Sequence, residues 1–240
     1  MVKKSDKSDV GRLGIKIENM SIGSKRVYKQ GHPDAPQWPA RCLFTGASGS
    51  GKTNLLVNLI LGGLIEFDSI YLYARNPDQE VYEDIKERIQ MLEETYNIKI
   101  PFVFESELSK VVPMEDLDKD KQNLVIFDDM VTEQERVQNA VISPFFVRSR
   151  HKNCSVYYLS QSYSLTPITA RRNVTFLCFF GTPRGRDIQL IWSDHAGEID
   201  FKKFKQAYLN ATAVRYSFFT IDLTNPDKKF RRGLSEVIKI

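Results

Sequence analysis

Eight consecutive residues in the first quarter of the chain have the types and spacing of a loop that binds phosphate. Such a loop turns its backbone N–H groups inward, which requires positive φ angles and little side-chain bulk, and glycine meets both needs. A lysine after the loop reaches the β- and γ-phosphates, and a threonine hydroxyl coordinates Mg²⁺. The residues are Gly46, Ala47, Ser48, Gly49, Ser50, Gly51, Lys52 and Thr53. They match the pattern G-x-x-x-x-G-K-[ST] in full and predict that the chain binds ATP with Mg²⁺.

A pair of carboxylates is expected where a buried strand ends. The run 124–127 is continuously apolar, as in a strand at the centre of a parallel sheet, and Asp128 and Asp129 follow it. Asp128 would hold Mg²⁺ through a water molecule, together with Thr53, and Asp129 would polarise the water that attacks the γ-phosphate. An Asp–Asp pair at a strand end is otherwise a common cap or turn, so this prediction depends on the phosphate loop.

Polar residues further along the chain extend the predicted catalytic site. Gln161 comes directly after a strand expected at 155–160, where its amide would contact both the γ-phosphate and the attacking water. Arg150, Arg171 and Arg172 are candidates for an arginine that enters a neighbouring subunit's site and stabilises the charge that develops on the transferred phosphoryl group. The same arginines suit a role facing DNA or solvent, and the sequence leaves these alternatives open.

Short apolar runs alternate with helical segments from residue 40 onward. We expect helices over 52–61, from 76–77 and from 132, and strands at 41–45, 69–73, 101–104, 124–127, 155–160, 174–180 and, as an edge strand, within 213–221. This alternation predicts an α/β fold of the RecA-like P-loop NTPase type, with a central, mostly parallel sheet between helices. Asp128 follows Lys52 by 76 positions, which leaves room for an additional strand between their two strands. Such spacing favours ATPases with an added catalytic carboxylate.

Composition predicts one folded body with two basic ends. The 240 residues include 42% hydrophobic and 27% charged residues, which excludes collagen, a disordered chain and a disulfide-stapled miniprotein. We expect a basic N-terminal arm at 1–38 with a short strand near 13–17, an ATPase domain at 39–224 and a basic C-terminal tail at 225–240. We also expect no membrane span, no secretory signal and buried free thiols at the three cysteines.

The formal net charge of +4 is the result of a cancellation. Residues 66–135 hold 7 basic against 19 acidic residues, whereas 148–205 hold 10 basic against 4 acidic residues. The predicted metal-site carboxylates fall in the acidic part, and the candidate arginines fall in the basic part. Head-to-tail contact between such subunits would bring opposite charges together, as a ring requires.

Four segments together resemble the FtsK/HerA superfamily of DNA-pumping ATPases, and particularly the poxvirus-type genome-packaging ATPases of double-jelly-roll DNA viruses and virophages. They are GASGSGKT (46–53), LVIFDD (124–129), RSRHKNCSVYYLSQS (148–162) and ITARRNVTFLCFF (168–180). The resemblance implies a homo-oligomeric ring of about five or six subunits that hydrolyses ATP to translocate double-stranded DNA into a preformed capsid. It also implies capsid vertex proteins as partners, and the viral assembly site in the host cytoplasm and the virion vertex as locations.

Asp129 departs from the commoner superfamily pattern, which places Glu at this position, but it still supplies a carboxylate. The sequence leaves two other functions open. One is a replicative or conjugative DNA motor of the same fold, which strand displacement on a forked duplex would favour. The other is a nucleotide-gated interaction protein without translocase activity, which DNA-independent turnover by a monomer would favour.

Overall fold

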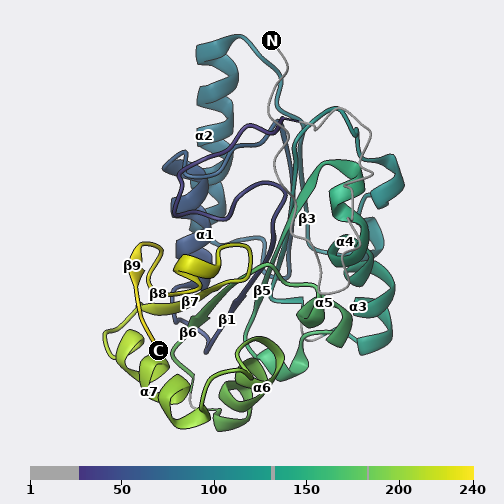
Figure 1. Cartoon of the computed structure of the whole chain (residues 1–240). Helices are drawn as coiled ribbons and strands as arrows, with labels where there is room; N and C mark the ends of the chain where they lie inside the picture. The colour runs from purple at the N-terminus through teal and green to yellow at the C-terminus, as the bar shows by residue number, and fades with distance from the viewer. Residues whose placement is uncertain (1–26, 131–132, 183) are drawn as a thin grey trace, which may run out of the picture.

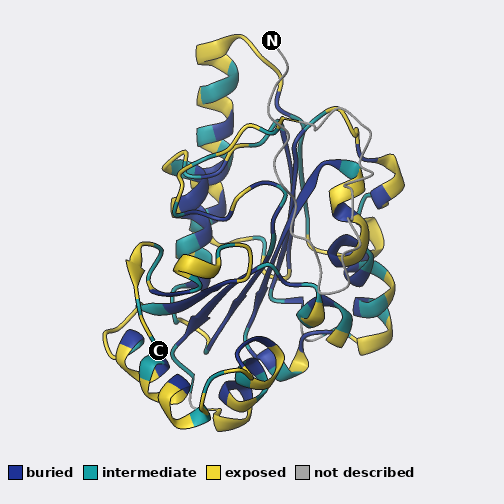
Figure 2. Cartoon of the chain, viewed as in Figure 1, coloured by how far each residue is buried: buried dark blue, intermediate teal, exposed yellow. Residues whose placement is uncertain are grey.

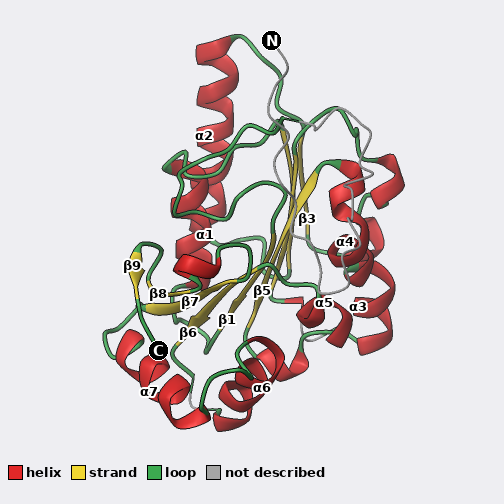
Figure 3. Cartoon of the chain, viewed as in Figure 1, coloured by secondary structure: helices red, strands yellow, loops and turns green. Residues whose placement is uncertain are grey.

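The computed structural model describes residues 27–130, 133–182 and 184–240. These residues form a nine-stranded sheet with helices packed on both of its faces (Figures 1 and 3). The strand order is β3-β2-β4-β5-β1-β6-β7-β8-β9. The predicted α/β fold with a mostly parallel sheet between helices is confirmed.

The strands β1 to β6 run parallel to one another, and β7 to β9 continue the sheet in antiparallel order. Because successive side chains of a strand point to opposite faces, β4 places Val125 and Phe127 in one hydrophobic core and Leu124 and Ile126 in the other. This is why its sequence is continuously apolar. The bounds are β1 (Arg41–Thr45), β2 (Ser69–Ala74), β3 (Phe102–Glu105), β4 (Asn123–Asp128), β5 (Cys154–Ser160), β6 (Phe176–Phe180), β7 (Phe218–Asp222), β8 (Phe230–Arg232) and β9 (Glu236–Val237).

The helices form a layer on each face of the sheet and bury only their inner sides (Figure 2). α1 (Lys52–Leu61) and α2 (Glu80–Tyr96) pack on one face. The other face is covered by α3 (Glu135–Val141), α4 (Ser143–Arg148), α5 (Ile168–Arg172), α6 (Gly185–His195) and α7 (Phe201–Ala211). None of the helices in the described part of the chain is long and apolar enough to cross a membrane. All three cysteines are buried free thiols, as expected.

The strand β5 lies between β1, which leads into the phosphate loop, and β4, which ends at Asp128, so it is the additional strand that the sequence analysis expects. It pairs with β1 on one side and with β4 on the other. The chain therefore supplies the additional strand after Asp128, while β2 and β3 of the preceding segment extend the sheet beyond β4. Since parallel strands end at the same edge of the sheet, the residue after β5 comes to lie between the phosphate loop and Asp129.

Residues 225–240, expected as a basic tail, contain β8 and β9, which are strands of the sheet. β8 pairs with β7, so the predicted edge strand within 213–221 lies inside the sheet. Arg231 is 1% exposed, and its guanidinium donates hydrogen bonds to Asp222 and to the carbonyl oxygens of Asp34 and Leu234. Removing one member of a buried ion pair costs about 3–5 kcal/mol. The basic residues that suggest a tail thus include one that is paired in the core.

The N-terminal arm expected at 1–38 also contributes to the folded body. Ala35 and Trp38 are buried, and the Trp38 indole donates a 2.8 Å hydrogen bond to Asn153. The backbone N–H of Lys29 donates to the side chain of Gln122 at 2.7 Å. The folded domain therefore begins before residue 39. The rest of the arm, including the strand expected near 13–17, lies outside the described residues.

Candidate active site

The phosphate loop joins the end of β1 to the start of α1, as its sequence predicts. Gly49 and Gly51 have φ angles of 70° and 104°, in the left-handed region that favours glycine. Gly46 has a φ angle of 155°, and there is a second reason for glycine at this position, because a Cβ atom there would lie 2.6 Å from Cβ of Phe180. Gly51 is the N-cap of α1. The loop therefore leads directly into the first turn of α1, where backbone N–H groups and the positive end of the helix dipole favour anions.

The Lys52 ammonium group lies inside the loop. Nζ donates to the carbonyl oxygens of Gly46 at 3.0 Å and Ala47 at 2.9 Å. Burial lowers the pKa of Lys52, whereas the charges of Asp128 and Asp129 oppose this shift. A phosphate group would give this buried ammonium an ionised acceptor, and hydrogen bonds between charged groups are stronger than those to neutral carbonyl oxygens.

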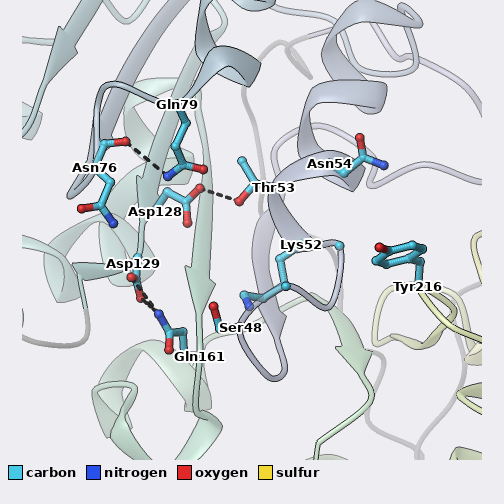
Figure 4. A pocket seen from close by; sticks show the side chains of 12 residues that line it. Ser48, Lys52, Thr53, Asn54, Asn76, Gln79, Asp128, Asp129, Gln161 and Tyr216 are labelled. Carbon is cyan, nitrogen blue, oxygen red and sulfur yellow. Dashed lines mark hydrogen bonds between the residues drawn. The ribbon is translucent and has the colours of Figure 1, made fainter.

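Asp128 connects the end of β4 to α1 and α2. Its Oδ2 accepts hydrogen bonds from the hydroxyl of Thr53 at 2.9 Å and from the hydroxyl of Tyr82 at 2.7 Å (the former is drawn in Figure 4). Burial raises the pKa of Asp128, and the two hydroxyl groups and the charge of Lys52 hold this rise back. The hydroxyl groups of Thr53 and Tyr82 and the charge of Lys52 therefore favour the ionised form of Asp128, against the effect of burial.

The donor set around Asp128 fits Mg²⁺ rather than a metal held by protein ligands alone. In the described residues, no group of three or more His, Cys, Asp or Glu side chains could hold a metal ion. Mg²⁺ is typically bound by one or two protein oxygens, with phosphate oxygens and water completing its octahedron. The adjacent oxygens of Thr53 and Asp128 match this requirement at the start of α1.

Asp129 and Gln161 form a second polar pair at the same edge of the sheet (Figure 4). Nε2 of Gln161 donates to both carboxylate oxygens of Asp129 at 2.8 Å. Asp129 has a φ angle of 58°, and its backbone N–H donates to the carbonyl oxygen of Leu159 at 3.0 Å. A non-glycine residue in this region costs about 1–3 kcal/mol, and such strain is concentrated at functional sites. The backbone thus turns the Asp129 carboxylate towards the end of β5.

A buried carboxylate on α6 fixes the turn that follows Gln161. Asp187 is 2% exposed and accepts hydrogen bonds from the backbone N–H groups of Tyr163 at 3.1 Å and Ser164 at 3.0 Å. The hydroxyl of Ser162 donates to it at 3.3 Å. The segment after β5 is therefore anchored on both sides of Gln161, by the sheet and by α6.

One cavity of about 590 Å³ joins these groups. Of the predicted residues it brings together Ser48, Gly49, Gly51, Lys52, Thr53, Asp128, Asp129 and Gln161. The loop residues Gly46, Ala47 and Ser50 complete the loop without lining the cavity. Its wall also includes four residues that the sequence analysis does not single out as site residues, Asn54, Asn76, Gln79 and Tyr216.

Some of the site residues that the sequence analysis did not identify carry a sequence signal, and others carry none. Asn76 is expected at the start of a helix, but α2 begins only at Glu80, with Gln79 as its N-cap. Asn76 lies just beyond the end of β2, so the rule that ligands bind at the carboxyl ends of parallel strands would have found it. No comparable signal marks Tyr82 or Tyr216, because each reaches the site through the tertiary fold.

None of the three candidate arginines lines the cavity. Arg171 is held within its own chain: its guanidinium lies 5.0 Å from the ring centre of Tyr163, and Nη1 lies 3.6 Å from a carboxylate oxygen of Asp194. Arg150 and Arg172 are exposed. A role for any of them in a neighbouring subunit's site stays a prediction.

The model of the Poxvirus A32 protein family matches residues 35–206 of the chain. DNA packaging protein OPG160 of Variola virus is 29% identical over 146 residues, which make up 59% of this chain and 53% of that protein. The protein of the same name from Monkeypox virus is also 29% identical, with 48% of its length covered. The chain thus spans about half the length of the curated relatives it matches.

Two solved structures of viral packaging proteins share this fold. The DNA-packaging ATPase B204 from Sulfolobus turreted icosahedral virus gives a TM-score of 0.58 at 15% identity, covering 83% of this chain and 98% of that chain. The genome packaging NTPase B204 from Sulfolobus turreted icosahedral virus 2, in complex with AMP, gives a TM-score of 0.56 at 12% identity, with the same coverage. At these identities the likeness shows the fold, in agreement with the predicted P-loop NTPase class.

Proposed function

Since this chain belongs to the Poxvirus A32 protein family, we propose that it is an ATP-hydrolysing motor that translocates double-stranded DNA during the packaging of a viral genome into a preformed capsid. The observation that carries this proposal is the single cavity in which the phosphate loop faces Asp128, Asp129 and Gln161. The names of the relatives, which are DNA packaging proteins, support DNA as the substrate that is moved. The proposal includes a homo-oligomeric ring, capsid vertex partners and action at the viral assembly site in the host cytoplasm and at the virion vertex.

In the proposed reaction, the triphosphate of ATP replaces the loop carbonyl oxygens as the partner of Lys52. The N–H groups of residues 46–51 and the Lys52 ammonium group would then hold the β- and γ-phosphates. Thr53 and Asp128 would hold Mg²⁺, which neutralises charge on the phosphate oxygens. Asp129 would accept a hydrogen bond from the attacking water, and Gln161 would hold the Asp129 carboxylate in position and contact the γ-phosphate.

We expect duplex DNA to raise ATP turnover at low salt and to lose this effect as salt increases. The reason is that a motor grips DNA mainly through phosphates, and each neutralised phosphate contributes about −0.9 to the slope of log K against log salt concentration. Steady-state turnover is measured with and without duplex DNA over a salt series, which gives the stimulation by DNA and its dependence on salt concentration. The DNA-translocation proposal fails if duplex DNA neither binds nor stimulates at low salt; DNA-independent turnover by a monomer would support the nucleotide-gated interaction protein.

Replacing Tyr82 with phenylalanine should move the acid side of the pH–activity profile to higher pH. The Tyr82 hydroxyl favours the charged form of Asp128, so its loss raises the pKa of a carboxylate that burial already raises. Asp128 is then protonated at a higher pH, and activity falls there. The measurement is kcat/KM between about pH 5 and 8. Tyr96→Phe, at an exposed tyrosine of the same helix, is the matched control, and coincident profiles for Tyr82→Phe and the unaltered protein would contradict the prediction.

A further inference from the structure

We propose that Tyr216 is a stacking platform for the nucleobase of the nucleoside triphosphate, which makes the rim of the cavity a base subsite. This inference rests on the proposed function and adds the part of the ligand that the phosphate loop does not recognise. Tyr216 lies in the segment before β7 and lines the same cavity as Lys52 and Thr53. It is distant in sequence from every motif that predicts phosphate or metal binding.

Tyr216 lies on the side of the phosphate loop where the base of a bound nucleoside triphosphate is expected. Asp129 and Gln161 lie on one side of the phosphate loop, and Tyr216 lies on the opposite side (Figure 4). The γ-phosphate must face Asp129 for an attacking water to reach it. The other end of the ligand, with its sugar and base, is then directed away from Asp129 and towards the side of the loop where Tyr216 stands.

The ring of Tyr216 is held close to the loop. A Cβ atom at Gly51 would lie 3.4 Å from Cδ1 of Tyr216, so the edge of the ring approaches the last glycine of the loop. Two residues further on, Phe218 packs against Phe180 with ring centres 5.0 Å apart, and Phe180 is the residue that crowds Gly46. The tyrosine and the phosphate loop are therefore parts of one packed unit.

The exposure and backbone of Tyr216 indicate a functional position rather than a packing one. The residue is 55% exposed although it carries a large aromatic ring. Its φ angle of 68° is in the left-handed region, which is an outlier for a bulky side chain. The carbonyl oxygen of Val214 accepts a hydrogen bond from the backbone N–H of Ser217, and this turn presents the ring at the cavity. Strained backbone of this kind is typical of ligand clamps.

Stacking would recognise the base through its π-face. Aromatic side chains stack on any base, since every base has such a face, and a guanidinium group adds a cation–π contribution. The guanidinium carbon of Arg215 lies 4.6 Å from the centre of the Tyr216 ring, so Arg215 covers one face of the ring and the base would stack on the opposite face. The chemistry that fits here is therefore a planar nucleobase joined to a triphosphate that the loop holds.

The test compares a ligand that has a base with one that has none. Equilibrium binding of ATP and of inorganic tripolyphosphate is measured, each with Mg²⁺, by titration calorimetry. In Tyr216→Ala we expect the Kd of ATP to rise at least about fivefold and the Kd of tripolyphosphate to stay unchanged. Tyr216→Phe should keep both affinities, because the ring remains. Tyr96→Ala, at another exposed tyrosine, is the matched control.

Each outcome separates the base subsite from the phosphate site. Unchanged ATP affinity in Tyr216→Ala overturns the platform, and so does an equal loss for ATP and tripolyphosphate, because Tyr216 would then only shape the loop. Retained tripolyphosphate binding in Tyr216→Ala also shows that the variant is folded. If the unaltered protein binds neither ligand, the nucleotide site of the proposed function fails, whatever the role of Tyr216.

Discussion

Replacing Lys52 with alanine is expected to reduce ATP turnover about a hundred- to a thousandfold. The Lys52 ammonium group lies within hydrogen-bond distance of two carbonyl oxygens of the phosphate loop, so it is fixed where the β- and γ-phosphates would bind. Its charge acts in a nearly buried position, where electrostatic interactions are stronger than in water. The lost group would stabilise the charge that grows on the phosphate oxygens in the transition state.

The Lys52→Ala result is checked by steady-state phosphate release and by ATP binding on the same preparation. Because burial disfavours the charged form of Lys52, removal of this charge is not expected to destabilise the fold, and thermal unfolding should show this. Lys86→Ala is a matched control, since Lys86 is paired with Glu83 on the surface of α2. Full turnover in Lys52→Ala would place the phosphate site elsewhere in the protein.

The part of the site that sequence predicts is the part set by local geometry. The phosphate loop needs glycines at fixed positions and a helix start after them, and α1 begins at Lys52 as expected. Asp128 and Gln161 are found because each follows an apolar strand, and parallel strands bring their carboxyl ends to one edge. A polar residue just after a buried strand is therefore visible from the sequence alone.

The part that sequence does not predict depends on contacts between distant segments. That β5 lies between β1 and β4 is a consequence of how the strands are ordered, and an apolar run does not encode its neighbours. Tyr82 reaches Asp128 only because α2 starts at Glu80 and packs beside α1. In the same way, the burial of Arg231 depends on its ion pair with Asp222 in the preceding strand. A count of basic residues does not reveal this pairing, and it therefore predicts that Arg231 belongs to a basic tail.

Replacing Asp129 with asparagine should reduce turnover about a hundred- to ten-thousandfold while leaving the Kd of ATP almost unchanged. Asparagine has nearly the same shape, and its one side-chain oxygen still accepts a hydrogen bond from Gln161. It lacks the negative charge that would polarise the attacking water. Lys52→Ala, in contrast, should weaken ATP binding as well as turnover, because Lys52 would contact the phosphates in both the ground state and the transition state.

The expected difference between the two variants, in ATP affinity, separates the role of Asp129 in the chemical step from the role of Lys52 in binding the phosphates. Single-turnover hydrolysis, with the protein in excess over ATP and above the Kd of ATP, isolates the chemical step in Asp129→Asn. Asp118→Asn, in the acidic stretch before β4, is the matched control. Gln161→Ala should show a weaker version of the same pattern, since Gln161 holds the Asp129 carboxylate by two hydrogen bonds. If Asp129→Asn lost ATP affinity and turnover in equal measure, Asp129 would serve binding, and the base for the attacking water would have to be another group.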